Sequence, residues 1–133
     1  MRENITNIPK VLVVESDLAY QKLLEKNIKR AGGKCECLFD GESALEKVAH
    51  NHYDLLLIDL RIPKLDGIML VKLLRERRYD TPLIAITALK VESLERNALA
   101  VGFNDFLEKP ITEVEISSLF EKYCHHKTAQ HAS

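Results

Sequence analysis

Four short apolar runs of this chain each end on a polar group: 10–14 before Glu15-Ser16-Asp17, 55–58 before Asp59, 82–86 before Thr87, and 103–107 before Glu108-Lys109-Pro110. A run that is apolar on both faces is typical of a central strand in a parallel sheet, because helices cover both sides of such a sheet. The carboxyl ends of neighbouring parallel strands meet along one edge, and ligands bind beyond that edge in open α/β sheets. We therefore expect carboxylates, a hydroxyl and an ammonium to converge there.

The chemistry that these groups favour is phosphoryl transfer to a carboxylate, which attacks the phosphoryl group and becomes an acyl phosphate. The developing charge requires a hard cation such as Mg²⁺, which prefers carboxylate and carbonyl oxygens together with waters. It also requires a fixed ammonium that pairs with a phosphoryl oxygen. Asp59, Thr87, Lys109 and the acids after the first run are candidates for these roles. Each also has a plainer interpretation: Asp59 as a solvated loop acid or helix cap, Thr87 as a helix N-cap, and Lys109 as a surface lysine.

Helical patterns alternate with the apolar runs. Apolar residues recur at the spacing of amphipathic helices in five stretches, at about 20–31, 44–48, 68–77, 91–101 and 116–123. A further strand, which carries Cys35 and Cys37, is expected between the first two helices. The result is five β-α units, a pattern that predicts a parallel sheet with helices on both faces.

These motifs, in this order and each at a strand end, resemble the receiver domain of two-component response regulators and hybrid histidine kinases over about residues 10 to 124. The resemblance is carried by the acidic cluster after the first strand, the DxxxPxxDG pattern from Asp59 to Gly67, Thr87-Ala88 and Lys109-Pro110. It implies an α/β, flavodoxin-like (βα)5 fold, doubly wound, with a five-stranded parallel sheet in strand order 2-1-3-4-5.

The resemblance also assigns roles on the phosphate side of the site. Asp59 is expected to accept the phosphoryl group, Lys109 to bind it as a cation, and Thr87 to close its hydroxyl on it, while Ala88 keeps the entrance small-walled. Phe106 lies where the family carries an aromatic switch residue, and a plain core phenylalanine is the alternative.

On the metal side the resemblance implies Mg²⁺ bound by Glu15, Asp59 and the backbone carbonyl of Arg61. This sequence departs from the family at one ligand. The family usually has two adjacent acids after the first strand, whereas here the second position is Ser16 and the next acid, Asp17, comes one residue late. Three outcomes are open: binding through Glu15 by way of water, a shifted loop that brings in Asp17, or weak metal binding. Ser16 and Asp17 are the candidates for a further metal ligand.

Two further residues of the pattern are interpreted as structural. Pro110 is expected to hold a cis peptide bond, which proline tolerates far better than other residues. Asp66-Gly67 is most simply a turn followed by the start of a helix.

The resemblance implies a signalling module rather than a dedicated enzyme, although self-dephosphorylation is compatible with it. A histidine kinase or a histidine phosphotransfer protein would donate the phosphoryl group. A downstream partner or a second copy of the chain would bind the surface formed by Val91 to Lys122. Ser16 favours one alternative, a receiver-like interaction module with impaired metal binding and phosphorylation. A haloacid dehalogenase-type phosphatase would have an acid two residues after Asp59, where this chain has Arg61.

Composition sets broader limits. Nineteen basic and twenty acidic residues give a net charge of −1, which implies no general attraction to nucleic acid or to a membrane surface. No apolar stretch approaches the roughly 20 residues of a membrane span, and the N-terminus lacks the apolar segment of a signal peptide. A cytoplasmic location is expected, and the three cysteines agree with a reducing compartment if Cys35 and Cys37 are small core residues.

The 133 residues suit a single domain. We expect one receiver domain over 1–133, with its core at about 10–124 and mobile ends at 1–8 and 125–133. No output domain is recognisable after Tyr123, so the chain is either a stand-alone regulator or the receiver of a larger protein such as a hybrid kinase.

Overall fold

A parallel sheet of five strands, in the order β2-β1-β3-β4-β5, forms the centre of the molecule. The computed structural model describes residues 8–124, so apart from Ile8 the ends expected to be mobile lie outside the described residues. The elements are β1 (Lys10–Val14), α2 (Leu18–Arg30), β2 (Lys34–Leu38), α3 (Gly41–His50), β3 (Leu55–Asp59), α4 (Gly67–Glu76), β4 (Leu83–Thr87), α5 (Glu92–Val101), β5 (Asp105–Glu108) and α6 (Glu113–Tyr123). The predicted doubly wound fold and strand order are confirmed.

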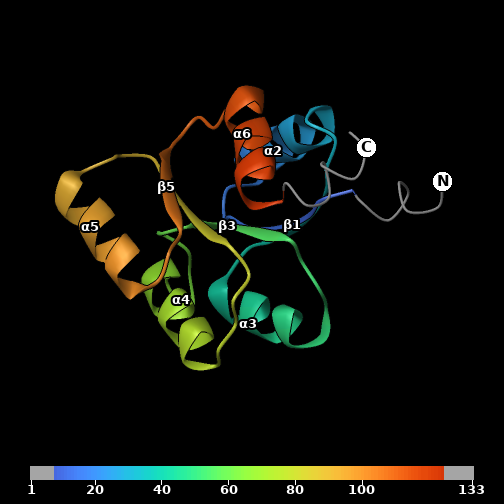
Figure 1. The fold of residues 1–133 in the computed structure, drawn as a ribbon. Helices are drawn as coiled ribbons and strands as arrows, with labels where there is room; N and C mark the ends of the chain where they lie inside the picture. Colours follow the sequence, from blue (N-terminus) through green and yellow to red (C-terminus); the bar gives the residue numbers. More distant parts are fainter. Residues whose placement is uncertain (1–7, 125–133) are drawn as a thin grey trace.

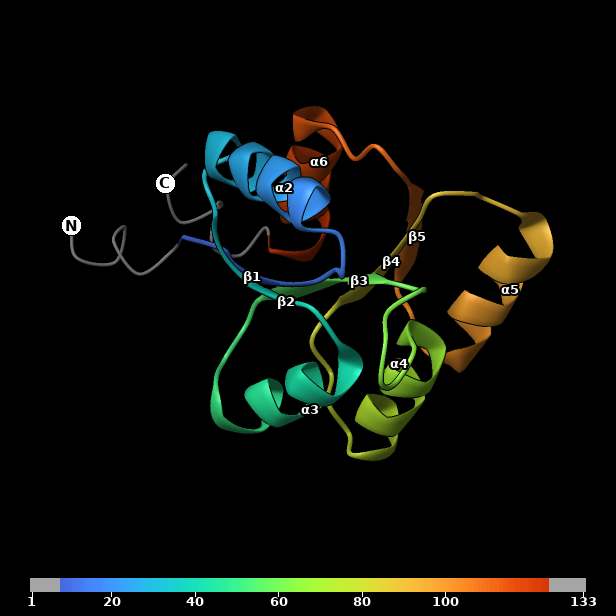
Figure 2. The same ribbon diagram turned by 180° about the vertical axis from the view of Figure 1, so that it is seen from behind.

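Helices cover both faces of the sheet. Helices α2 and α6 lie together on one face, and α3 and α4 lie on the other, with α5 beside α4 at the β5 end (Figures 1 and 2). Alternate residues of each central strand point to opposite faces. Leu55 and Leu57 of β3 therefore join the cluster under α2 and α6, while Leu56 and Ile58 join the cluster under α3, α4 and α5. Burying each of these side chains contributes roughly 1.5–3 kcal/mol, which fixes β3 and the position of Asp59 at its end.

Most helix starts are fixed by a side chain. Asp17, Asp40, Asp66 and Thr112 each accept a backbone N–H bond at the N-terminus of the helix that follows, an interaction worth about 1 kcal/mol. The interpretation of Asp66 as a helix start is thereby confirmed. Helix α5 is the exception, because its N-cap is Val91 and no side chain caps it. Thr87 is thus not the cap of the helix that follows it.

Helix α5 is held at its other end. The partly buried Arg75 guanidinium of α4 donates to the carbonyl of Gly102, at 3.0 Å from Nε and 2.8 Å from Nη2, and to the Asn104 side chain at 2.8 Å. Within α5 the one residue classed as buried is Ala98. The helix is therefore anchored near Gly102 and weakly specified near Val91.

The cysteines differ from the expectation in part. Cys124 is fully buried, but Cys35 and Cys37 are half-buried because β2 is an edge strand that pairs with β1 alone. None of the three is part of a disulfide. No helix within residues 8–124 has the length and apolar content to cross a membrane.

Candidate phosphoryl-acceptor site

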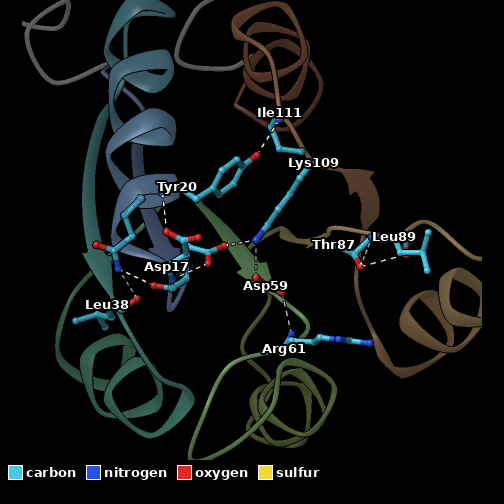
Figure 3. A network of polar contacts seen from close by, with 11 residues as sticks. Asp17, Tyr20, Leu38, Asp59, Arg61, Thr87, Leu89, Lys109 and Ile111 are labelled. Atoms are coloured by element: carbon cyan, nitrogen blue, oxygen red, sulfur yellow. Dashed lines mark hydrogen bonds and ion pairs between the residues drawn. The ribbon is translucent and has the colours of Figure 1, made fainter.

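The side chains predicted to converge do so at the carboxyl edge of the sheet. Lys109, directly after β5, places its Nζ 2.7 Å from Oδ2 of Asp59 and 2.6 Å from Oε1 of Glu15. Asp59 ends β3 and Glu15 follows β1, so three strands that are distant in sequence supply one cluster (Figure 3). Asp59 is 7 % exposed and Glu15 1 %. These groups are shielded from water, and their interactions are correspondingly stronger than on the surface.

The cluster combines one positive charge, on Lys109, with two acids, Asp59 and Glu15. Burial acts to lower the pKa of Lys109, but its hydrogen bonds to Asp59 and Glu15 outweigh burial and raise the pKa above its usual value. The ammonium therefore stays charged. Burial raises the pKa of the Glu15 carboxyl, against the opposing effect of Lys109. With both carboxylates ionised, one ammonium faces two of them, and a net negative charge remains that a bound cation would offset.

Each oxygen of Asp59 has a donor. Oδ2 accepts from Lys109, and Oδ1 accepts from the backbone N–H of Arg61 at 2.9 Å. The Arg61 N–H points at Asp59 because the chain turns sharply after β3. Two donors thus hold Asp59 in a fixed orientation.

The residues around Glu15 decide how a metal could bind. Oε2 of Glu15 accepts the backbone N–H of Asp17 at 2.8 Å, and Oδ1 of Asp17 caps α2 by accepting the N–H of Tyr20 at 3.2 Å. Ser16 is exposed. Among residues 8–124 no three His, Cys, Asp or Glu side chains are grouped as a metal centre. Two carboxylates and a backbone carbonyl nevertheless suit Mg²⁺, which uses one or two carboxylates and keeps several waters.

Thr87 lies on the side of Asp59 opposite to Asp17, and its hydroxyl is hydrogen-bonded within its own loop (Figure 3). Its hydroxyl donates to the carbonyl of Leu89 at 3.2 Å and accepts the backbone N–H of Leu89 at 3.3 Å (Figure 3). Between this loop and Asp59 lies a cavity of about 280 Å³, lined by Asp59, Arg61, Thr87, Ala88, Leu89, Val91 and Leu94. It is large enough to admit a phosphoryl group, and Ala88 is among its lining residues.

Phe106 and Pro110 lie on either side of Lys109 in the sequence. Phe106 is 2 % exposed and belongs to the core cluster under α3, α4 and α5, in the position of the core phenylalanine that was the alternative. The Lys109–Pro110 peptide bond is cis, as expected. The backbone N–H of Lys109 donates to the carbonyl of Thr87 at 2.7 Å, so the ends of β4 and β5 are joined where their functional side chains begin.

The site also contains residues that the sequence patterns did not single out. The Lys109 ammonium makes a cation–π contact with the ring of Tyr20, with Nζ 4.5 Å from the ring centroid. Gln21 donates from Nε2 to the carbonyls of Glu15, at 2.7 Å, and of Leu38, at 3.1 Å. Tyr20 begins the apolar helical stretch predicted at about 20–31, and no spacing rule distinguishes such a residue from an ordinary core tyrosine.

The strand order, the two helical layers and the acidic edge with its lysine define a receiver module of two-component signal transduction. The chain belongs to the response regulator receiver domain family, whose model matches residues 11–121. Among curated proteins, it is 34 % identical over 109 residues to the alkaline phosphatase synthesis transcriptional regulatory protein PhoP of Bacillus subtilis, covering 82 % of this chain and 45 % of that one. It is 30 % identical over 129 residues to the osmosensing histidine protein kinase SLN1 of Saccharomyces cerevisiae, covering 92 % of this chain and 10 % of that one. The chain thus spans about half or less of these relatives.

Solved structures agree with this placement. The receiver domain of the Francisella response regulator 1452 superposes with a TM-score of 0.83 at 32 % identity, over 89 % of this chain and 98 % of that one. The receiver domain of a sensor histidine kinase from Pseudomonas aeruginosa, which has a magnesium ion coordinated in its active-site cleft, superposes with a TM-score of 0.80 at 28 % identity, over 89 % and 98 % of the two chains.

Proposed function

We propose that Asp59 accepts a phosphoryl group from a phosphohistidine of a histidine kinase or a histidine phosphotransfer protein, with Mg²⁺ as cofactor. The observation that carries this proposal is the 2.7 Å contact between Lys109 Nζ and Oδ2 of Asp59, beside a cavity large enough to admit a phosphoryl group. A carboxylate fixed next to an ammonium can attack phosphorus while the ammonium stabilises the charge on the phosphoryl oxygens.

In the transfer step, an oxygen of Asp59 forms a bond to phosphorus as the phosphorus–nitrogen bond of the donor histidine breaks and the imidazole leaves. Lys109 turns from Asp59 to a phosphoryl oxygen, and the Thr87 hydroxyl exchanges the Leu89 carbonyl for another. Glu15, Asp59 and the carbonyl of Arg61 would hold Mg²⁺, with Ser16 or Asp17 as a further ligand. When bound, the metal would supply positive charge to the phosphoryl oxygens.

Incubation with a small phosphodonor such as acetyl phosphate tests the proposal. We expect the intact mass of the wild-type chain to increase by one phosphoryl group in Mg²⁺ and to remain unchanged in excess chelator. Hydroxylamine should remove the added group, because it cleaves acyl phosphates but not phosphate esters. A chain that gains no mass in Mg²⁺, or whose added mass survives hydroxylamine, would contradict the assignment.

The module then passes its state to other molecules. Helices α5 and α6 with β5, which make up the surface from Val91 to Lys122, would bind a downstream partner or a second copy of this chain. The near-neutral net charge gives no reason to expect direct contact with nucleic acid or membrane, and the proposed setting is the cytoplasm. We propose a single receiver domain over 1–133 that signals rather than catalyses, apart from loss of its own phosphoryl group.

The second candidate function, a receiver-like interaction module, rests on Ser16. We expect the wild-type chain to bind Mg²⁺ weakly and Ser16→Asp to bind it roughly tenfold more tightly, because hard cations gain from each added charged oxygen ligand. Titration calorimetry measures the difference. Ser16→Asn is the matched control, since it has the size of Asp without its charge and should leave the affinity unchanged.

If Ser16→Asp binds Mg²⁺ no more tightly than the wild type, then Glu15 or Asp17 already fills this ligand position. If the wild type binds no Mg²⁺ and gains no phosphoryl group while Ser16→Asp does both, the chain is an interaction module in its natural form.

A further inference from the structure

Helix α2 holds the segment after Lys109 at two points. Tyr20 Oη accepts the backbone N–H of Ile111 at 2.8 Å, and Asn27 Nδ2 donates to the carbonyl of the same residue at 3.1 Å. Tyr20 and Asn27 lie about two turns apart and therefore on one face of the helix. Both backbone polar groups of Ile111, two residues beyond Lys109, are thus bound by side chains from one helix.

The tyrosine also contacts the ammonium itself. Its ring lies under Lys109 Nζ at 4.5 Å from the centroid, on the side away from Asp59 (Figure 3). A cation over the face of an aromatic ring is attracted to it, and more strongly where water is excluded. Lys109 is therefore bounded by two carboxylates and by the Tyr20 ring, which limits the rotamers of a side chain that is otherwise very mobile.

Packing alone does not explain these contacts. The core between α2 and the sheet is filled by Leu24 and Ile28, which are fully buried, whereas Tyr20 and Asn27 are only half-buried. The Tyr20 ring packs against the edge of that core, but packing does not require its hydroxyl or the Asn27 amide. The side chains of Tyr20 and Asn27 make their polar contacts with Lys109 or with Ile111 just after it.

We propose that Tyr20 and Asn27 are positioning residues that hold the Lys109 ammonium against Asp59, so that α2 sets the reactivity of the acceptor. The clamp fixes the backbone after Lys109, and the ring fixes the direction of the side chain. Because coupling is reciprocal, movement of Lys109 from Asp59 to a phosphoryl oxygen also alters the contacts of α2. This proposal deepens the proposed function and rests on it for the rate of phosphorylation, but the placement of Lys109 can be tested without phosphorylation.

Two variants of Tyr20 separate the ring from the hydroxyl. Tyr20→Phe keeps the ring over Lys109 and loses the bond to Ile111, whereas Tyr20→Leu loses both. With a small phosphodonor in Mg²⁺, we expect the first-order rate constant of phosphorylation to fall about tenfold in Tyr20→Leu, since small misplacements of a charged group have effects of this size. The half-saturating donor concentration should stay unchanged. Tyr20→Phe should recover most of the rate, and Asn27→Leu should lower it by an amount between the two.

The second readout is the NMR signal of the Lys109 side chain, recorded in the unphosphorylated protein. A ring over the ammonium shifts the signals of Nζ and Cε, so Tyr20→Leu should move them and Tyr20→Phe should not. Leu23→Ala, an exposed change on the same helix, is the control, and thermal unfolding identifies any variant that has lost its fold.

Wild-type rates together with unchanged Lys109 signals in Tyr20→Leu would overturn the proposal. Lys109 signals that shift in Asn27→Leu, which keeps the Tyr20 ring, in a protein that cannot be phosphorylated at all would support the clamp and count against the proposed function instead. Should Tyr20→Leu fail to fold, Asn27→Leu and Tyr20→Phe carry the test. A wild-type rate in Asn27→Leu would then exclude the clamp.

Discussion

Replacement of Asp59 by asparagine should abolish phosphorylation of the chain. The amide oxygen of asparagine is a far weaker nucleophile than a carboxylate. Among the described residues, the acids that pair with Lys109 are Asp59 and Glu15. Both oxygens of Asp59 accept a bond, one from Lys109 and one from the Arg61 N–H. An amide has a single acceptor oxygen, so it can accept from only one of these two donors, and Lys109 keeps its contact with Glu15.

Intact mass measured after acetyl phosphate treatment decides the matter. Asp66→Asn is the matched control, because it makes the same chemical change seven residues further along, and asparagine is as good an N-cap as aspartate. The control variant should gain one phosphoryl group like the wild type. Equal labelling of Asp59→Asn and wild type would require a different acceptor.

Lys109→Ala and Thr87→Ala should fail in different ways. Loss of the ammonium leaves Glu15 and Asp59 buried without their cation and removes charge stabilisation from the phosphoryl group. We therefore expect Lys109→Ala to lose phosphorylation by a factor of about 100 or more, the order of effect seen when one such stabilising donor is removed. Thr87→Ala should still be phosphorylated, because its hydroxyl contacts Leu89 and not Asp59.

What Thr87→Ala should lose is the signal. A phosphoryl group shifts a protein between two states only through contacts that differ between them, and the exchange of the Leu89 carbonyl for a phosphoryl oxygen is such a contact. The Leu89 loop leads into the end of α5 that no side chain caps. The opposite end is held by Arg75 at Gly102. We expect the response to be largest at residues 89–95 and smallest near Gly102.

Hydrogen exchange from 91 to 122, with and without a beryllofluoride phosphate mimic, measures this response. Wild type and Thr87→Ser, which keeps the hydroxyl, should change protection, whereas Thr87→Ala should not. Unchanged protection in the wild type would describe a module that binds phosphate without switching, and the interaction-module alternative would gain.

The convergence of Asp59, Glu15, Thr87 and Lys109 could be predicted because it follows from two regularities alone. Uninterrupted apolar runs predict strands buried on both faces, and parallel strands bring their carboxyl ends to one edge. The role of Asp66 followed from an equally local signal, an acid and a glycine ahead of an apolar helical stretch. The residues around Asp59 were therefore predictable from the apolar runs, the ends of the strands and the starts of the helices.

Features set by contacts between side chains were not predictable. The segment 103–107 was expected to form a strand from Phe103, but β5 begins at Asp105. The reason is that the Asn104 side chain accepts the Leu83 N–H at 2.8 Å and also binds Arg75, so a side chain takes the place of a strand bond. The contacts of Tyr20 and Asn27 with the Lys109 segment are of the same kind. These contacts depend on the rotation of a helix about its axis and on the length of a side chain. Neither quantity produces a periodic pattern in the sequence.

The bond between Lys109 and Asp59 spans fifty residues of chain, and this separation has a consequence during synthesis. A ribosome adds about 5–20 residues per second, so a growing chain possesses Asp59 for roughly 3–10 s before Lys109 exists. In that interval Glu15 and Asp59 are two acids without their cation, and like charges oppose the pairing of β1 with β3. With Asp59 as the proposed acceptor, we expect the nascent polypeptide to react far more slowly with a phosphodonor than the folded protein does. On this proposal, full competence to receive a signal arises only once the last strand has joined the sheet.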